Sequence, residues 1–161
     1  MITTKTLCKM IMVLSFPFVA HSQQPNLTSL DQLYNRAAQG SDTVYVINFW
    51  ATWCVPCLKE LLSFEMLHTR FGKEKLKVLL VNVDFKTRQQ TIVLPFLKKR
   101  KFQTEVCLLD EPNQEAFINR VDTAWSGAIP ATLFMQGSKR RFYEAEFTYP
   151  QLAAAYQTFK Q

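Results

Sequence analysis

The feature that most constrains the fold of this chain is a pair of cysteines at the junction between a strand and a helix. Residues 44–50 (VYVINFW) are rich in β-branched and aromatic side chains, which predicts a buried strand. After three intervening residues, Cys54-Val-Pro-Cys57 opens a segment in which apolar side chains recur at helical spacing, at Leu61, Phe64, Leu67 and Phe71. This order predicts an α/β fold in which both cysteines lie at the amino end of a helix.

Strands and helices alternate along the rest of the chain, which is typical of a largely parallel sheet covered on both faces. We expect residues 23–27 to be a short disordered lead, Pro95 to kink one helix, and residues 136–138 (Gln-Gly-Ser) to join two antiparallel strands. The predicted helices lie between Ser29 and Gly40 and at 54–71, 88–101, 113–121 and 149–160, and the predicted strands at 44–50, 76–83, 106–109, 131–135 and 140–146. Together they predict a three-layer α/β/α sandwich whose mixed sheet ends in an antiparallel hairpin.

The first 22 residues have the pattern of a secretory signal peptide. Lys5 and Lys9 form a basic start, residues 10–20 an apolar run, and residues 20–22 (Ala-His-Ser) a small-residue cleavage site. The apolar run is short for a membrane-spanning helix, although an uncleaved N-terminal anchor is the alternative. We therefore expect an exported, periplasmic protein with one domain over residues 23–161.

The number of cysteines supports a redox role for the C-x-x-C motif. Removal of the first 22 residues leaves Cys54, Cys57 and Cys107, and three cysteines cannot all pair within one chain. In an oxidising compartment the closely spaced pair is more readily a redox device than a structural link. Cys107 lies in a predicted strand and is expected to be a small apolar core residue, with a resolving role as the alternative.

The position of the pair predicts which sulfur reacts first. Backbone N–H groups at the start of a helix stabilise an anion, and the thiolate is the reactive form of cysteine. We therefore expect Cys54 to be the nucleophile and Cys57, one turn later, to resolve the mixed disulfide, with neither sulfur deep inside the protein. The alternative is half of a zinc site, but the nearest imidazole, His68, lies roughly 16 Å along the helix from Cys57 and cannot complete it. We expect no metal.

Two segments resemble the signatures of the thioredoxin superfamily. Residues 48–57 (NFWATWCVPC) are similar to its active-site segment, most closely to the exported TlpA/ResA-type reductants, and residues 125–132 (WSGAIPAT) are similar to its second signature. The resemblance implies that Pro130 is cis and faces the cysteines, and that the Ile129 backbone pairs with an extended substrate. It also implies that residues 106–121 are the strand and helix inserted in the exported subfamily, and that a membrane thiol-reducing protein donates electrons.

Three further residues are candidates for supporting roles. Many thioredoxins carry a buried, proton-shuttling Asp where this chain has Asn48, so that acid is missing. Glu60 matches an acidic residue of the exported relatives and falls on the apolar stripe of its helix, so burial should raise its pKa and suit it to proton exchange with Cys57. A solvated surface glutamate is the equal alternative. Trp53 is expected to frame the site for substrate.

We considered three functions. The first is a thiol–disulfide oxidoreductase that reduces protein disulfides, in cytochrome c maturation or general periplasmic redox chemistry, with no cofactor beyond its own Cys54–Cys57 disulfide. Because no His stands between the cysteines, we expect a potential nearer about −270 mV than about −120 mV. The second is a periplasmic copper- or haem-handling protein, for which Met66 is the nearest thioether. The third is a fold used only for protein contacts. Two basic runs, 98–101 and 139–141, are expected to be solvated, and no nucleic-acid partner is expected.

Overall fold

The computed structural model describes residues 25–161, and a six-stranded mixed sheet forms its centre. The strands are β1 (Asn26–Thr28), β2 (Val44–Trp50), β3 (Leu76–Asn82), β4 (Glu105–Leu109), β5 (Ala131–Gln136) and β6 (Lys139–Tyr143). They lie in the order β1-β4-β3-β2-β5-β6. Neighbours from β1 to β2 are parallel, whereas β5 and β6 add an antiparallel edge. The predicted terminal hairpin is confirmed.

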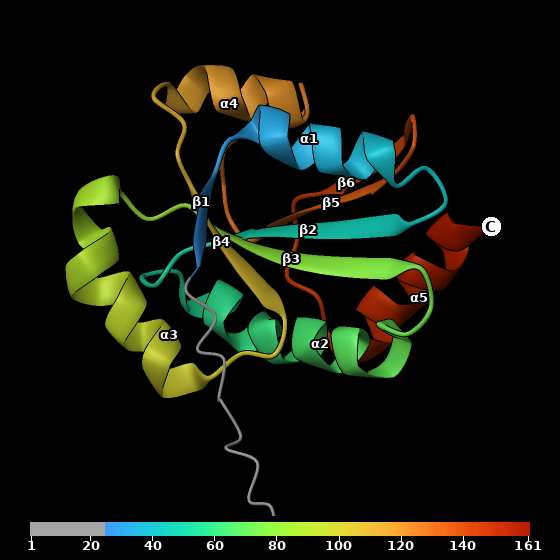
Figure 1. Ribbon diagram of the computed structural model, residues 1–161, viewed down its shortest axis with the longest axis horizontal. Helices are drawn as coiled ribbons and strands as arrows, with labels where there is room; N and C mark the ends of the chain where they lie inside the picture. Colours follow the sequence, from blue (N-terminus) through green and yellow to red (C-terminus); the bar gives the residue numbers. More distant parts are fainter. Residues whose placement is uncertain (1–24) are drawn as a thin grey trace, which may run out of the picture.

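Helices cover both faces of this sheet (Figure 1). The helices α1 (Leu30–Gln39) and α4 (Gln114–Val121) lie on one face, and α2 (Val55–Phe71), α3 (Leu94–Arg100) and α5 (Tyr149–Lys160) lie on the other. The strand β4 and the helix α4 form the predicted inserted unit. The expected three-layer, thioredoxin-like α/β/α sandwich is therefore confirmed.

The strand β2 is buried along its whole length because it separates two hydrophobic cores. Side chains alternate across a strand, so Val46 and Trp50 enter the core under α2 and α5, while Ile47 and Phe49 enter the core under α1 and α4. Burial on both faces is what a central parallel strand requires, and it explains the nearly continuous apolar sequence of this segment. The rigid β2 in turn fixes the point from which residues 51–54 leave the sheet.

Two sequence-based predictions of local structure were wrong or incomplete. Residues 26–28 form β1 rather than a disordered lead, because they pair in parallel with β4, with Asn26 opposite Cys107. The predicted helix over 88–101 is divided into a 3₁₀ turn (Lys86–Arg88), a π-helical segment (Gln89–Val93) and α3. The α-helical part begins one residue before Pro95, which lacks the N–H needed in a helix interior.

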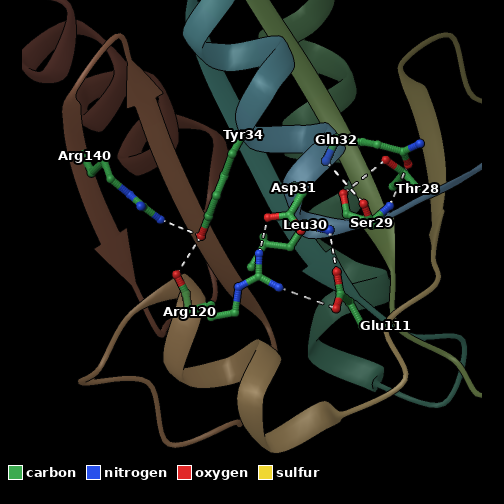
Figure 2. Close-up of polar contacts among 9 residues, drawn as sticks. All are labelled: Thr28, Ser29, Leu30, Asp31, Gln32, Tyr34, Glu111, Arg120 and Arg140. Atoms are coloured by element: carbon green, nitrogen blue, oxygen red, sulfur yellow. Dashed lines mark hydrogen bonds and ion pairs between the residues drawn. The ribbon is translucent and has the colours of Figure 1, made fainter.

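Polar contacts attach the inserted unit to the neighbouring elements (Figure 2). The Arg120 side chain pairs with Asp31 of α1 and lies 3.8 Å from the Glu111 carboxylate. Glu111 accepts a hydrogen bond of 2.6 Å from the Leu30 N–H at the start of α1. The Tyr34 hydroxyl donates to the Arg120 carbonyl and accepts from Arg140 of β6. These contacts hold α4 against α1, away from the cysteine pair.

The expected signal peptide, residues 1–22, lies outside the described residues. Within residues 25–161, no helix combines the length and the apolar character needed to cross a membrane.

Candidate active site

Cys54 and Cys57 form a disulfide at the amino end of α2, with a Cα–Cα distance of 5.2 Å. Cys54 is the N-cap residue, and its Sγ accepts a hydrogen bond of 3.2 Å from the Cys57 N–H. Pro56, in the first turn, costs no hydrogen bond there because the first N–H groups of a helix have no partner within the helix. The N–H groups of α2 therefore point at the Cys54 sulfur, where they would stabilise negative charge after reduction.

The two sulfurs differ in access to solvent. Cys54 retains 4% of its surface, between the exposed side chains of Trp53 and Val55, whereas Cys57 is completely buried. The expectation that neither sulfur lies deep inside was therefore wrong for Cys57, which packs under α2 in the hydrophobic core. The two cysteines therefore differ in how closely a client could approach them.

The loop before β5 lies directly beside Cys54. The Ile129–Pro130 peptide bond is cis, and the Ile129 carbonyl oxygen lies 3.6 Å from the Cys54 sulfur. These segments meet because β5 pairs with β2, with Ala131 opposite Phe49. The structure thus brings together Cys54, Ile129 and Pro130, which the sequence separates by about 75 residues.

A buried carboxylate that the sequence analysis missed holds the segment leading into the cysteines. Asp84, just after β3, accepts hydrogen bonds from the Thr52 N–H (2.7 Å), the Thr52 hydroxyl (2.8 Å) and the Asn82 side-chain amide (2.8 Å). The available signal was the position of a polar residue after a buried strand. Because β3 neighbours β2, such a residue lies at the same sheet edge as the motif.

Glu60 lies in the core under α2 with 1% of its surface exposed. One carboxylate oxygen accepts from the Asn48 side-chain amide and the other from the Phe147 N–H, both at 2.7 Å. Burial raises its pKa from 4.5 to about 7; the two hydrogen bonds oppose this rise, and the nearby Glu146 charge adds to it. The surface-glutamate alternative is therefore excluded, and the expected rise in pKa is present.

Cys107 is a free thiol with no exposed surface. Burial raises its pKa to about 12, so the thiol is neutral at physiological pH. It belongs to the core under α1 and α4, whereas Cys54 and Cys57 belong to the core on the other side of the sheet. This placement supports the expected apolar role and argues against a resolving role.

Among residues 25–161, no three His, Cys, Asp or Glu side chains gather closely enough to hold a metal ion. Met66, considered above as a copper ligand, faces solvent on the outer side of α2.

The fold and the disulfide at the start of α2 define the class of the protein: a thioredoxin-like protein with a redox-type cysteine pair. A sequence model of the AhpC/TSA family matches residues 17–138, which is more than half of the chain. The chain belongs to this family.

Similar proteins of known sequence or structure carry thiol–disulfide names. Sporulation thiol-disulfide oxidoreductase A of Bacillus subtilis is 30% identical over 63 residues, which cover 39% of this chain and 38% of that protein. The match thus spans well under two thirds of this relative.

Two solved structures show the same fold. A thiol:disulfide interchange protein of the thioredoxin family from Chlorobium tepidum has a TM-score of 0.63 and 16% identity, covering 78% of this chain and 85% of its own. A secreted thiol-disulfide isomerase from Corynebacterium glutamicum has a TM-score of 0.60 and 20% identity, covering 74% of this chain and 71% of its own.

Proposed function

We propose that this protein is an exported thiol–disulfide oxidoreductase that reduces protein disulfides. The observation that carries the proposal is a disulfide in which Cys54, 4% exposed against none for Cys57, caps α2 with its sulfur 3.6 Å from the Ile129 carbonyl oxygen. A structural disulfide needs no such access, and a protein used only for contacts needs no sulfur there.

The reaction follows from the two environments. In the reduced protein the Cys54 thiolate attacks one sulfur of a client disulfide, which forms a mixed disulfide and releases the other client sulfur as a thiolate. The Cys57 thiolate then attacks Cys54, which re-forms the protein disulfide and releases the second client thiolate. Two electrons pass to the client, and the client thiolates take up two protons, one of them originating on Cys57.

Glu60 is the proposed acceptor of the Cys57 proton. It lies one turn after Cys57 on the buried side of α2, and a pKa of about 7 lets it exist in both protonation states near neutrality. Glu60 acts inside the protein, where water does not reach freely. A carboxylate in this position would speed the resolving step rather than the first attack.

The residues around Cys54 suit an extended client. Ile129 presents its carbonyl beside the sulfur, as the resemblance to the thioredoxin superfamily implies for pairing with a substrate backbone. Trp53 is exposed next to the sulfur and offers an apolar contact. We assign both, with Pro130, to substrate binding.

Export and the direction of electron flow complete the proposal. Residues 1–22 have the pattern of a signal peptide, and the similar structure from Corynebacterium glutamicum is that of a secreted protein. Because no His between the cysteines stabilises the thiolate, a reductant of the TlpA/ResA type fits better than an oxidant. It would be re-reduced by a membrane thiol-reducing protein, and cytochrome c maturation is one setting for its clients.

Turnover of insulin disulfides tests this function. The wild type with dithiothreitol as the electron source should accelerate insulin precipitation, whereas Cys54→Ser and Cys57→Ser should not. Cys107→Ser is the matched control and should retain activity, since Cys107 lies on the other side of the sheet. Failure of the wild type to exceed dithiothreitol alone would reject the proposal.

A further inference from the structure

The outer side of α2 is an exposed surface that the proposed reaction does not use. Side chains at helical spacing form one stripe along it, and we call this stripe the α2 outer face: Val55, Lys59, Leu62, Met66, Arg70 and Lys73. Lys73 lies just beyond the end of the helix. Leu62 is 68% exposed and Met66 is 43% exposed, which is unusual for large apolar side chains next to each other on a helix.

The α2 outer face begins inside the redox motif. Val55 stands between the two cysteines, and the stripe runs from there along a 17-residue helix, which is about 25 Å long. A shallow groove of about 640 Å³ lies along its second half, bordered by Tyr149 at the start of α5. A partner segment that covers the whole stripe, from the groove to Val55, therefore reaches the turn that carries Cys54.

The stripe that defines the α2 outer face carries three basic side chains and no acidic one. Lys59, Arg70 and Lys73 form no ion pair among the described residues. The carboxylate in the groove, Glu65, already accepts hydrogen bonds of 2.9 Å from the N–H groups of Gln103 and Thr104.

Those two hydrogen bonds hold the loop between α3 and β4 against the side of α2. The α2 outer face therefore presents apolar and basic side chains in one stripe, and a complementary partner must be apolar and acidic.

We propose that the α2 outer face is a docking surface for redox-partner proteins, and that it binds an amphipathic segment with apolar side chains on one side and carboxylates along its edges. The inference rests on the proposed oxidoreductase function, because it is the disulfide that needs the partner to be close. Docking beside the motif raises the local concentration of the partner's disulfide at Cys54 and selects acidic partners.

Two synthetic peptides provide the probe. Both peptides are designed as amphipathic helices with the same Leu-rich face. The positions that flank this face are Glu in one peptide and Lys in the other. Each is joined by a short Gly-Ser linker to the same fluorogenic disulfide reporter, and versions without cysteine serve for binding measurements.

Reduced wild type should reduce the Glu peptide with a kcat/KM about tenfold above that of the Lys peptide at about 50 mM salt, and the ratio should shrink at about 500 mM salt. The cysteine-free Glu peptide should bind the oxidised protein by fluorescence anisotropy. Two double variants should abolish both the faster reduction of the Glu peptide and its binding. One combines Leu62→Ser with Met66→Ser, and the other combines Lys59→Glu with Arg70→Glu. Reduction of the reporter disulfide alone should not change in these variants, which also shows that they fold. Leu27→Ser and Lys77→Glu, exposed on β1 and β3, are the matched controls and should behave as the wild type.

Equal rates for the two peptides, with the bare reporter still reduced, would overturn the docking proposal and leave the proposed function standing. Binding to vesicles of anionic phospholipid that is lost in the same variants, together with equal peptide rates, would overturn it in favour of a lipid surface. If the wild type did not reduce even the bare reporter, the oxidoreductase function would fail and the docking proposal with it.

Discussion

Replacing Glu60 with Gln tests the most unusual electrostatic feature of the structure. The Glu60 carboxyl is buried and has a pKa of about 7, compared with 4.5 in an exposed setting. The folded protein therefore holds a proton that the unfolded chain has already released at pH values between these two limits. This contribution to stability is fully present below about pH 4.5 and is lost as the pH rises through about 7.

The size of this loss follows from the difference in pKa. The pKa of Glu60 is about 2.5 higher in the folded protein than in an exposed setting, which corresponds to about 3 kcal/mol in the free energy of unfolding at about 1.4 kcal/mol per pKa unit. Glu60→Gln removes the ionisable group, but its amide NH2 is a donor and cannot accept a hydrogen bond. Either the Asn48 amide or the Phe147 N–H therefore loses its acceptor. That mismatch costs about 1–3 kcal/mol at every pH. The stability of the variant relative to the wild type should therefore improve by about 3 kcal/mol between pH 4.5 and pH 8.

Urea unfolding of the oxidised proteins at intervals from pH 4.5 to pH 8 measures this difference. Glu115→Gln on the surface of α4 is the control and should follow the wild type. Parallel curves for Glu60→Gln and the wild type would refute the reasoning, because they would mean that Glu60 titrates alike in both states. Stopped-flow measurement of thiol exchange in Glu60→Gln tests the proposed proton transfer separately, and an unchanged rate would remove Glu60 from the mechanism.

Three further predictions concern other parts of the site. Asp84→Ala removes the acceptor of three hydrogen bonds and should lower the free energy of unfolding in urea by about 2–4 kcal/mol. The control Asp110→Ala breaks the exposed ion pair with Lys86 and should cost under about 1 kcal/mol. Equal losses would show that Asp84 does not fix the segment before Cys54. Cys107, whose pKa is raised to about 12, should resist iodoacetamide at pH 8 in the native oxidised protein and react once urea unfolds it; rapid native labelling would contradict its burial. Equilibration with glutathione and dithiothreitol buffers should give a potential nearer about −270 mV than about −120 mV, and a value above about −150 mV would reverse the assignment as a reductant.

Local sequence patterns were sufficient where the structure depends on local periodicity. The run 44–50 predicts β2 because a central strand is apolar on both faces, and the 3.6-residue stripe of α2 places Glu60 on the buried side. The change from the strand pattern of 44–50 to helical spacing after Cys54 likewise places this cysteine at the start of α2. These features need no knowledge of distant residues.

The missed features depend on contacts between distant segments. The strand β1 has only three residues, and its hydrogen bonds go to β4, about 80 residues away. Two of the three donors to Asp84 come from Thr52, 32 residues earlier, and the Phe147 N–H reaches Glu60 across 87 residues. No local pattern encodes such partners, although a polar residue after a buried strand marks where to look for one.

The most direct test of the account is the reactivity of each cysteine alone. Cys57→Ser and Cys54→Ser, both carrying Cys107→Ser, are incubated with a disulfide-containing protein, and intact-mass spectrometry detects mixed disulfides. Cys54, which keeps 4% of its surface exposed beside the Ile129 carbonyl, should capture the client in Cys57→Ser, whereas the completely buried Cys57 should capture little in Cys54→Ser. Equal capture by both variants, or none by Cys57→Ser, would contradict the assignment of Cys54 as the attacking sulfur.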